Sequence, residues 1–428
     1  MRATIHAPAG VVGRTALTVL RLSGPRTGEI VAALAGGLPA PRRASLRRLR
    51  GADGSTLDRA LVLWFPGPDS YTGEDCAELH LHGGVAVFSA VTAALEHLGA
   101  RPAEPGEFTR RAVLEGKLDL LEAEATLDLI EAETDAQRTQ ALRHLGGEMS
   151  AVAESWRADL LRLLAHQEAL IDFPDEDLPP EVEAALLAGI AALRDVFAQA
   201  LAQGARGERL RSGLVFAIVG APNAGKSTLF NALCQRDVAI VSPIAGTTRD
   251  VLEARIVLDG VPVTLLDTAG LRDTDDPVEA EGVRRAKARL AEADLTMAVS
   301  DDAVWPDLPQ GVPVLRVQTK RDLRGPVADA DITVSALDGD GVDALLDHLL
   351  VWARDLAGLS ASPTLTRARH RAVLLAASEA LDAARDAELP ELRGESLRQA
   401  MREVGRLTGL VDPEEVLGAI FGEFCIGK

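Results

Sequence analysis

Near the N-terminus, apolar residues recur in short runs that are bounded by turn residues. Residues 17–22, 60–65 and 76–82 predict three strands, and the last run alternates apolar and polar positions as a half-buried strand does. A Gly-Gly pair at 83–84 then precedes an apolar stretch that predicts a helix through residue 98. Strands mixed with helices over residues 1–117 indicate an α+β domain.

After residue 118 the apolar positions recur every three or four residues, which is the period of an amphipathic helix. One unbroken apolar stripe contains Leu142, Leu145, Met149, Val152, Trp156, Leu160 and Leu163. A further helix is expected over 186–201, a linker over 204–213 and a second helical block over 366–404. The spacing predicts an α-helical bundle in which each helix buries one face against a partner.

Between the two helical blocks, apolar runs at 214–219, 263–266, 314–317 and 332–334 predict the strands of a parallel α/β sheet. The fold class is therefore multidomain, with an α/β domain inserted into the helical bundle. The predicted parts are an N-terminal α+β domain (1–117), a first helical part (118–211), the inserted domain (212–355) and a second helical part (356–428).

A phosphate-binding loop is predicted directly after the first strand of the inserted domain. Residues 220–227 read Gly-Ala-Pro-Asn-Ala-Gly-Lys-Ser, and a helix is expected to follow them. Glycines let backbone N–H groups converge on an anion, and the helix N-terminus adds positive potential. Lys226 is expected to reach the β- and γ-phosphates, and Ser227 to bind Mg²⁺. The flanking strand and helix disfavour the alternative of a chance glycine-rich turn.

Four later motifs stand in the order that a GTPase requires. Gly-Thr-Thr-Arg-Asp at 246–250 offers a threonine to Mg²⁺ and the γ-phosphate. Asp-Thr-Ala-Gly at 267–270 offers an aspartate near Mg²⁺ and a glycine N–H near the γ-phosphate. Thr-Lys-Arg-Asp at 319–322 and Ser-Ala-Leu at 335–337 follow the next two strands. At the ends of parallel strands, these motifs together indicate a P-loop GTPase domain.

Guanine recognition is assigned to Asp322, whose carboxylate can accept hydrogen bonds from guanine N1 and N2 that adenine cannot supply. Thr319 replaces the usual asparagine of this motif, so reduced affinity or selectivity for guanine is expected. Leu271 stands where Ras-like proteins have a water-positioning glutamine. The candidate replacements are Asp273, Asp275, Asp276, Glu279 and Glu281, each of which also suits a solvated acidic loop.

Composition limits the classes of protein and the compartment. The 428 residues carry a net charge of −19, which argues against a generally basic nucleic-acid-coating protein. The three cysteines, Cys76, Cys234 and Cys425, are far apart and indicate a reducing compartment without a disulfide framework. No apolar run is expected to reach the ~18–20 residues of a membrane span. With no signal peptide at the N-terminus, a cytoplasmic location is expected.

Three smaller features each leave two interpretations open. The five arginines between residues 42 and 50 form a solvated face or a phosphate-binding patch. His80 and His82 lie on one strand face as metal ligands could, but ordinary hydrogen-bonded histidines are favoured because no third ligand is identifiable. Asn223 holds a monovalent cation that replaces an arginine finger, or it is a turn residue.

Taken with these motifs, the chain resembles the MnmE (TrmE) family of tRNA-modification GTPases over nearly its whole length. The resemblance is carried by Arg-Leu-Ser-Gly-Pro at 21–25, Tyr-Thr-Gly-Glu-Asp at 71–75, Glu-Leu-His-Leu-His-Gly-Gly at 78–84, Pro-Gly-Glu-Phe-Thr-Arg-Arg-Ala at 105–112, Gly-Lys-Leu-Asp-Leu at 116–120, Ile-Asp-Phe-Pro at 171–174 and the C-terminal Phe-Cys-Ile-Gly-Lys at 424–428. The last motif, together with an inserted GTPase domain, is highly specific.

The resemblance implies an N-terminal domain that binds 5-formyltetrahydrofolate, or a related one-carbon folate, and forms a constitutive homodimer. By motif position, the implied folate contacts are Arg21, Glu78, Lys117 and Lys428. The implied catalytic residues are Glu279, Lys226 and Thr248, with Ser227 and Thr248 on Mg²⁺ and with Asn223, Ser242, Ile244 and Thr247 on K⁺. The implied GTP contacts are Asn223, Ala224, Gly225, Lys226, Ser227, Thr228, Ser242, Thr247, Thr248, Asp267, Thr268, Ala269, Gly270, Thr319, Lys320, Asp322, Ser335, Ala336 and Leu337.

The resemblance further implies a complex, a heterotetramer or larger, with an MnmG-like FAD protein and with tRNA. That complex adds a carboxymethylaminomethyl group at C5 of the wobble uridine (position 34), and GTP hydrolysis drives a conformational cycle. Cys425 is a candidate for covalent chemistry, or a buried thiol without a catalytic role. A ribosome-assembly GTPase that binds rRNA remains the alternative, although the acidic helical blocks offer no basic RNA-binding module. A P-loop kinase would lack the motifs at 319–322 and 335–337.

Overall fold

The computed structural model describes residues 2–172, 180–235, 252–267, 292–306, 311–327, 329–358, 364–410 and 427. These residues fall into two compact units. The first unit comprises residues 1–127, 144–158 and 401–428, and the second comprises 128–143 and 159–400.

A six-stranded sheet forms the centre of the N-terminal part, in the order β3-β4-β5-β2-β1-β6. Its strands are β1 (Ile5–Pro8), β2 (Thr15–Ser23), β3 (Ser45–Arg50), β4 (Thr56–Phe65), β5 (Cys76–Gly83) and β6 (Arg101–Pro102). Only β1 and β6 pair in parallel among these strands, and the other pairs are antiparallel. The three strands predicted from the apolar runs are confirmed as β2, β4 and β5.

Two helices, α1 (Thr27–Ala35) and α2 (Val85–His97), cover one face of this sheet. The residues of β2 and β5 that point toward them, such as Leu20 and Leu79, are fully buried. The alternate residues of the same strands, such as Arg21 and Glu78, lie on the opposite face and stay partly exposed. Because strand side chains alternate, Arg21 and Glu78 point away from α1 and α2. The helix α3 (Glu107–Leu114) follows β6.

His6 is buried in β1, and neither of its ring nitrogens has a hydrogen-bond partner. Burial lowers the pKa of His6 below its usual 6.5, and Glu96, whose Oε1 lies 3.7 Å from Nε2, opposes the shift. Below pH 6.5 the unfolded chain therefore binds a proton that the folded chain does not. The free energy of unfolding falls by up to about 1.4 kcal/mol for each pH unit of acidification.

We therefore expect the thermal midpoint to drop between pH 7 and pH 5, and to drop less in His6→Gln than in the wild-type protein. The measurement is thermal unfolding followed by circular dichroism across that pH range. Parallel pH profiles for the two proteins would show that His6 does not contribute to the acid sensitivity.

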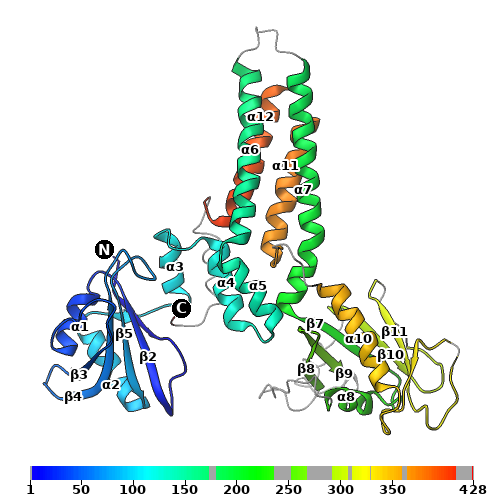
Figure 1. Cartoon of the computed structure of the whole chain (residues 1–428), viewed down its shortest axis with the longest axis horizontal. Helices are drawn as coiled ribbons and strands as arrows, with labels where there is room; N and C mark the ends of the chain where they lie inside the picture. The colour runs from blue at the N-terminus through cyan, green and yellow to red at the C-terminus, as the bar shows by residue number, and fades with distance from the viewer. Residues whose placement is uncertain are drawn as a thin grey trace, which may run out of the picture. The chain divides into compact units, whose positions relative to one another are not determined.

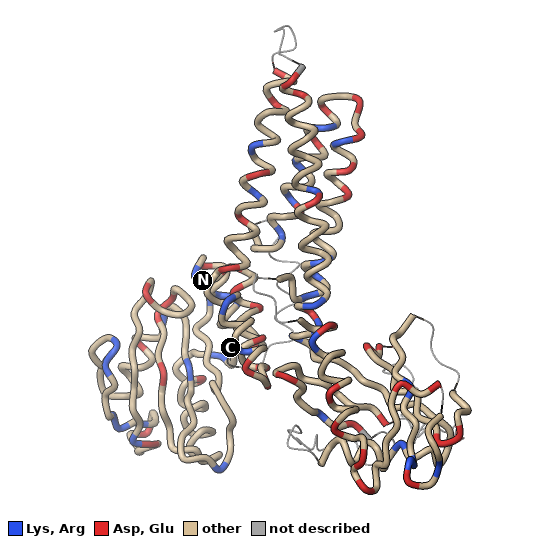
Figure 2. The backbone as a smooth tube through the Cα atoms, turned by 45° about the vertical axis from the view of Figure 1, so that its right-hand side comes forward, with Lys and Arg blue, Asp and Glu red and all other residues tan. Residues whose placement is uncertain are grey.

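The helical part contains six described helices. They are α4 (Leu120–Glu131), α5 (Asp135–Leu145), α6 (Glu148–Asp172), α7 (Pro180–Ser212), α11 (Ala368–Asp386) and α12 (Pro390–Thr408). Figure 1 shows α6, α7, α11 and α12 side by side. Ion pairs join them, including Arg194 of α7 with Asp382 of α11 at 2.5 Å. Acidic and basic residues are interspersed along these helices (Figure 2), as expected for helix faces in contact with solvent.

One helix prediction is wrong in detail. The apolar stripe over 142–163 is divided between α5 and α6, which are separated at Gly147, where φ is +82°. No linker occupies 204–213, because α7 continues to Ser212. Gly207 faces Thr364, where an added Cβ would lie 2.3 Å from the threonine Oγ1. The glycines of this helix therefore permit close packing instead of ending it.

The helix α7 also corrects the expectation that no apolar stretch reaches membrane-spanning length. Residues 181–212 are long and apolar enough to cross a membrane, with a mean hydropathy of 1.5 in the most apolar window. The stripe Leu186, Ile190, Leu193 and Phe197 is at most 4% exposed inside the helical part. These four residues form the buried face of α7, and 22% of the most apolar window is buried overall.

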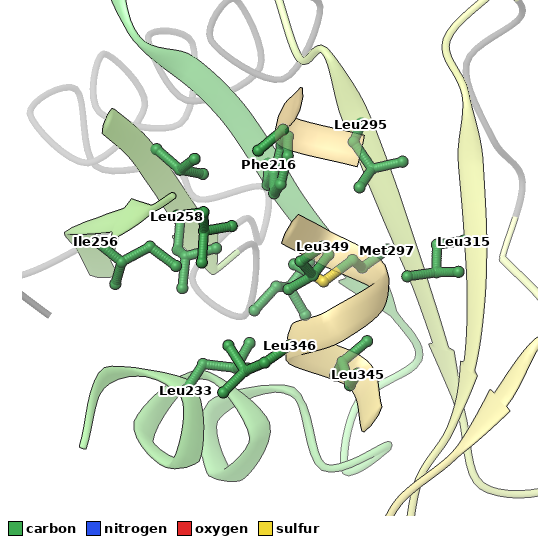
Figure 3. Close-up of a cluster of buried hydrophobic side chains, with 14 of the residues drawn as sticks. Phe216, Leu233, Ile256, Leu258, Leu295, Met297, Leu315, Leu345, Leu346 and Leu349 are labelled. Carbon is green, nitrogen blue, oxygen red and sulfur yellow. The ribbon is translucent and has the colours of Figure 1, made fainter. Parts of the chain in front are cut away.

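The inserted domain has a second sheet, ordered β12-β11-β10-β7-β9-β8, in which β8 is antiparallel to β9 and the other pairs are parallel. Its elements are β7 (Leu214–Gly220), α8 (Lys226–Cys234), β8 (Leu252–Leu258), β9 (Val261–Asp267), β10 (Leu295–Ser300), β11 (Val314–Gln318), β12 (Ile332–Thr333) and α10 (Val342–Ala357). Leu349 of α10 lies beside Met297 of β10, and Leu346 of α10 lies beside Leu233 of α8, in one apolar core (Figure 3). The predicted fold class, with α+β, helical and α/β parts, is confirmed.

Candidate functional site: a nucleotide cradle and a second polar face

The glycine-rich loop joins β7 to α8 at the centre of the second sheet. Asn223 and Gly225 have φ values of +63° and +89°, so the backbone turns through the left-handed region twice. An added Cβ at Gly220 would lie 2.2 Å from the carbonyl oxygen of Val299 in β10. Only glycine allows the loop to begin so close to the neighbouring strand.

Lys226 is the first residue of α8, and it is only 7% exposed. Its Nζ donates hydrogen bonds to the carbonyl oxygens of Gly220 at 2.9 Å and Ala221 at 2.8 Å. The ammonium is therefore held over the loop that it belongs to. A cation in this position, together with the N-terminus of α8, suits the binding of phosphate groups.

Ser227 and Asp267 come together although they are 40 positions apart in the sequence. The Ser227 Oγ donates to Oδ2 of Asp267 at 2.7 Å. Asp267 ends β9 and is 1% exposed. A hydroxyl and a carboxylate at this spacing are hard oxygen donors, which fit Mg²⁺.

Two side chains after β11 fasten the base-reading loop to the phosphate loop. The Thr319 Oγ1 donates to the carbonyl oxygen of Ala224 at 2.5 Å, and Thr319 is 1% exposed. The Lys320 Nζ donates to the carbonyl oxygen of Asn223 at 2.7 Å and to Asp301 at 2.9 Å. The hydrogen bond from Lys320 lowers the pKa of Asp301. Thr319 therefore retains a contact with the phosphate loop in place of the usual asparagine.

Asp322 is oriented by the loop that follows β12. The Ser335 Oγ donates to Oδ1 of Asp322 at 3.0 Å and lies 3.1 Å from Oδ2 of Asp338. Ser335 is buried, whereas Leu337 of the same motif is 81% exposed. Sequence reasoning missed Asp301 and Asp338. The only signal for Asp301 was its position at the carboxyl end of β10, and for Asp338 its position three residues after Ser335.

The other predicted residues of this site lie outside the described part of the chain. They are Ser242, Ile244, Thr247, Thr248, Thr268, Ala269, Gly270, Leu271, Asp273, Asp275, Asp276, Glu279 and Glu281. Cys425 and Lys428 of the C-terminal motif lie outside it as well.

A second polar face lies on β2 and β5, on the side of the first sheet that α1 and α2 leave open. Arg21 and Glu78 are paired in register, and the guanidinium donates to Glu78 Oε1 at 3.1 and 3.3 Å. The same guanidinium lies 5.6 Å from the ring centre of Tyr71 and 6.0 Å from that of Phe108. A cation, a carboxylate and exposed aromatic edge together suit a flat, polar heteroaromatic ligand.

Lys117 lies near this face, against the loop that contains Gly73. Its Cε lies 3.4 Å from the position that a Cβ on Gly73 would take. Of the predicted folate contacts, Arg21 and Glu78 contact each other, and Lys117 lies against the 71–75 loop.

The two histidines of β5 are hydrogen-bonded, as expected. His82 Nδ1 lies 2.7 Å from Oδ1 of Asp58, and His80 Nε2 lies 3.4 Å from Oε2 of Glu78. Within the described ranges, no group of three His, Cys, Asp or Glu side chains is placed to hold a metal ion. Of the five arginines between residues 42 and 50, Arg47, Arg48 and Arg50 lie on β3, and Arg42 donates to the carbonyl oxygen of Asp69.

Two family models match the chain. The model described as "GTP-binding protein TrmE N-terminus" matches residues 4–117, and that described as "MnmE helical domain" matches residues 120–425. Proteins named "tRNA modification GTPase MnmE" are similar over the full length. That of Gluconacetobacter diazotrophicus is 57% identical, over 99% of this chain and 98% of that protein. That of Rhodospirillum rubrum is 53% identical, over 99% of each.

Among solved structures, Era of Aquifex aeolicus bound to GDP and AlF4⁻ is similar at 27% identity. The match covers 41% of this chain and 69% of that one, with a TM-score of 0.26. The G domain of the T. maritima FeoB iron transporter is 21% identical. The match covers 33% of this chain and 98% of that one, with a TM-score of 0.25.

Proposed function

The chain belongs to the MnmE family of tRNA modification GTPases, and on that premise we propose that it hydrolyses GTP to GDP and phosphate within a tRNA-modifying complex. One observation carries the proposal. At one edge of the second sheet, Thr319 and Lys320 tie the loop that holds Asp322 to the loop that holds Lys226. These contacts support a single site in which adjoining loops bind the base and the phosphates of one nucleotide.

In this proposal the described residues bind three parts of the substrate: its phosphates, its base and the associated Mg²⁺. Lys226 binds the β- and γ-phosphates, and Asp322, oriented by Ser335, reads the guanine base. Ser227 and Asp267 hold Mg²⁺, which neutralises phosphate charge when it is bound. The remaining roles go to residues outside the described ranges: Thr248 on Mg²⁺ and Glu279 as the group that orients the attacking water.

Potassium is assigned to the site that includes Asn223, with Ser242, Ile244 and Thr247 as further ligands. The backbone carbonyl of Asn223 already accepts a hydrogen bond from Lys320 Nζ at 2.7 Å. Its side chain is exposed at the loop surface, so the side-chain oxygen is the atom available to a cation. A cation there would stabilise the charge that develops at the β–γ bridge during hydrolysis.

We expect GTP turnover in K⁺ to exceed that in Na⁺ at matched ionic strength by roughly tenfold or more, and Asn223→Ala to remove the difference. The measurement is steady-state phosphate release by the full chain. Asn231→Ala, which changes an exposed asparagine of α8, serves as the matched control and should keep the stimulation. Equal rates in the two salts would exclude cation-assisted hydrolysis and leave Asn223 as a turn residue.

The polar face of the first unit is proposed to bind 5-formyltetrahydrofolate or a related one-carbon folate. Arg21 and Lys117 supply cations for its carboxylates, and Tyr71 and Glu78 supply an aromatic edge and an acceptor for its ring. A bound folate would supply a one-carbon unit. Lys428 is a further proposed contact outside the described ranges.

The homodimer is assigned to the same sheet. Leu17, Leu46 and Leu61 are 52%, 59% and 42% exposed on the face that also carries Arg21 and Glu78. Exposed apolar residues gathered on one sheet face are typical of a protein interface.

The partner proteins and the product follow the family. The proposed complex contains an MnmG-like FAD protein, is a heterotetramer or larger and lies in the cytoplasm. It adds a carboxymethylaminomethyl group at C5 of the wobble uridine, and hydrolysis of GTP drives the conformational cycle. The proposed domains are 1–117 for folate and dimerisation, 118–211 and 356–428 for the bundle, and 212–355 for GTP.

A further inference from the structure

The β8–β9 hairpin connects two sides of the nucleotide site. β8 begins at Leu252, two residues after the Gly-Thr-Thr-Arg-Asp motif, and β9 ends at Asp267. Leu252 and Asp267 are paired in register, so both sides of the site meet at one end of the hairpin. The other end is the turn at Asp259 and Gly260, roughly 20 Å away for strands of this length.

The turn of the hairpin is fastened to two helices. Asp259 and Gly260 have φ values of +51° and +82°, which make the turn tight. Asp259 Oδ2 accepts a hydrogen bond from Arg354 Nε of α10 at 2.5 Å. An added Cβ at Gly260 would lie 3.4 Å from Cβ of Ala136 in α5. The far end of the hairpin therefore lies against α5 of the helical part.

An ion pair on the side of the hairpin makes a second connection to the helical part. Arg255 of β8 donates to Glu133, which lies two residues before α5. The side chains of Arg255 and Glu133 are 46% and 43% exposed. Because solvent screens such a pair, its loss should leave the stability of the fold nearly unchanged.

The first turn of α5 also contacts the end of α7, the helix that leads through β7 to the phosphate loop. Gln137, next to Ala136, donates from Nε2 to the carbonyl oxygens of Leu210 at 3.2 Å and Arg211 at 2.9 Å. These are the last turn of α7, which continues into β7 and the phosphate loop. One helical turn thus holds both the hairpin and α7.

From this arrangement we infer that the helical part senses the bound nucleotide at the first turn of α5, with Arg255 and Glu133 as positioning residues for GTP hydrolysis. A displacement of Asp267 moves the hairpin, and the hairpin moves against α5. Conversely, α5 fixes the hairpin and so fixes Asp267 beside Ser227. The inference rests on the proposed GTPase function and adds the contacts that couple the nucleotide site to the helical part.

The test is a charge exchange in the full chain: Arg255→Glu, Glu133→Arg and the double variant. Hydrogen exchange of the α5 amides is compared with Mg²⁺ and K⁺ present, in GDP and in a non-hydrolysable GTP analogue. In the wild-type protein we expect exchange to differ between the two nucleotides. Each single variant should lose at least half of that difference and lower kcat about fivefold with KM unchanged, and the double variant should recover both.

Arg157→Glu is the matched control, because it breaks an exposed ion pair on α6 with the same change of charge. It should keep the wild-type exchange and kcat. Failure of the double variant to recover either quantity, or wild-type exchange that is the same in both nucleotides, would overturn the inference. A wild-type protein that binds neither nucleotide would overturn the proposed function along with it.

Discussion

Asp322→Asn should reverse the nucleotide preference from GTP to XTP. The asparagine NH2 group and the amino group at C2 of guanine are both donors, so they cannot form a hydrogen bond. Xanthine has a carbonyl oxygen at C2, which can accept one. An unpaired buried polar group costs on the order of 1–3 kcal/mol, so GTP affinity should fall by up to about 100-fold. Affinity for XTP should rise by a comparable factor because the same amide then finds an acceptor.

The geometry makes this substitution a sharp test of base recognition. The Ser335 hydroxyl, 3.0 Å from Oδ1 of Asp322, can donate to an amide oxygen equally well, so the new side chain keeps its orientation. Dissociation constants for GTP, GDP, XTP and ATP would be measured by fluorescence titration. Asp340→Asn, which alters an exposed acid paired with Arg321, is the control and should leave the preference for GTP intact. Tight GTP binding by Asp322→Asn would mean that other groups read the base.

Arg111→Met should destabilise the first unit by about 3–5 kcal/mol, the cost of removing one member of a buried ion pair. Arg111 is 5% exposed and donates at 2.8 Å to both Glu74 and Glu107. Burial raises the pKa of Glu107, but hydrogen bonds from Arg101, Glu104 and Arg111 outweigh burial and lower that pKa overall. Without Arg111, Glu74 would lose its 2.8 Å partner and keep only Arg2 at 4.0 Å, and Glu107 would keep Arg101 but lose its buried donor.

The measurement is denaturant unfolding of the full chain, with the transition of the first unit followed by hydrogen exchange of β2 and β5. Arg26→Met is the matched control, because Arg26 forms only an exposed pair with Glu29. We expect little change in its unfolding midpoint. An Arg111→Met protein as stable as this control would show that the buried charges are compensated elsewhere.

Short motifs with a fixed structural context were predictable from the sequence. The phosphate loop lies between a strand and a helix as its glycines require, and Asp267 ends a strand beside Ser227. These features depend on residues close together in the sequence or on strand ends that a parallel sheet brings together. The fold class followed from the same local periodicities.

What the sequence did not reveal depends on contacts between distant segments. Gly204 and Gly207 suggested a linker because glycine disfavours helix, but close packing on Leu365 and Thr364 outweighs that preference. The partners of Asp322 and Lys320, Ser335 and Asp301, were found only when the loops after β10, β11 and β12 came together. No local pattern encodes such pairings.

Because α7 runs without a break into β7, the GTP-binding domain does not end where its motifs end. Leu210 of α7 is 3% exposed and belongs to the same apolar core as Phe216 and Leu349. A fragment cut at residue 212 would leave that core without one of its side chains. Exchange of this domain between relatives would therefore have to include the last turn of α7 and a compatible α5.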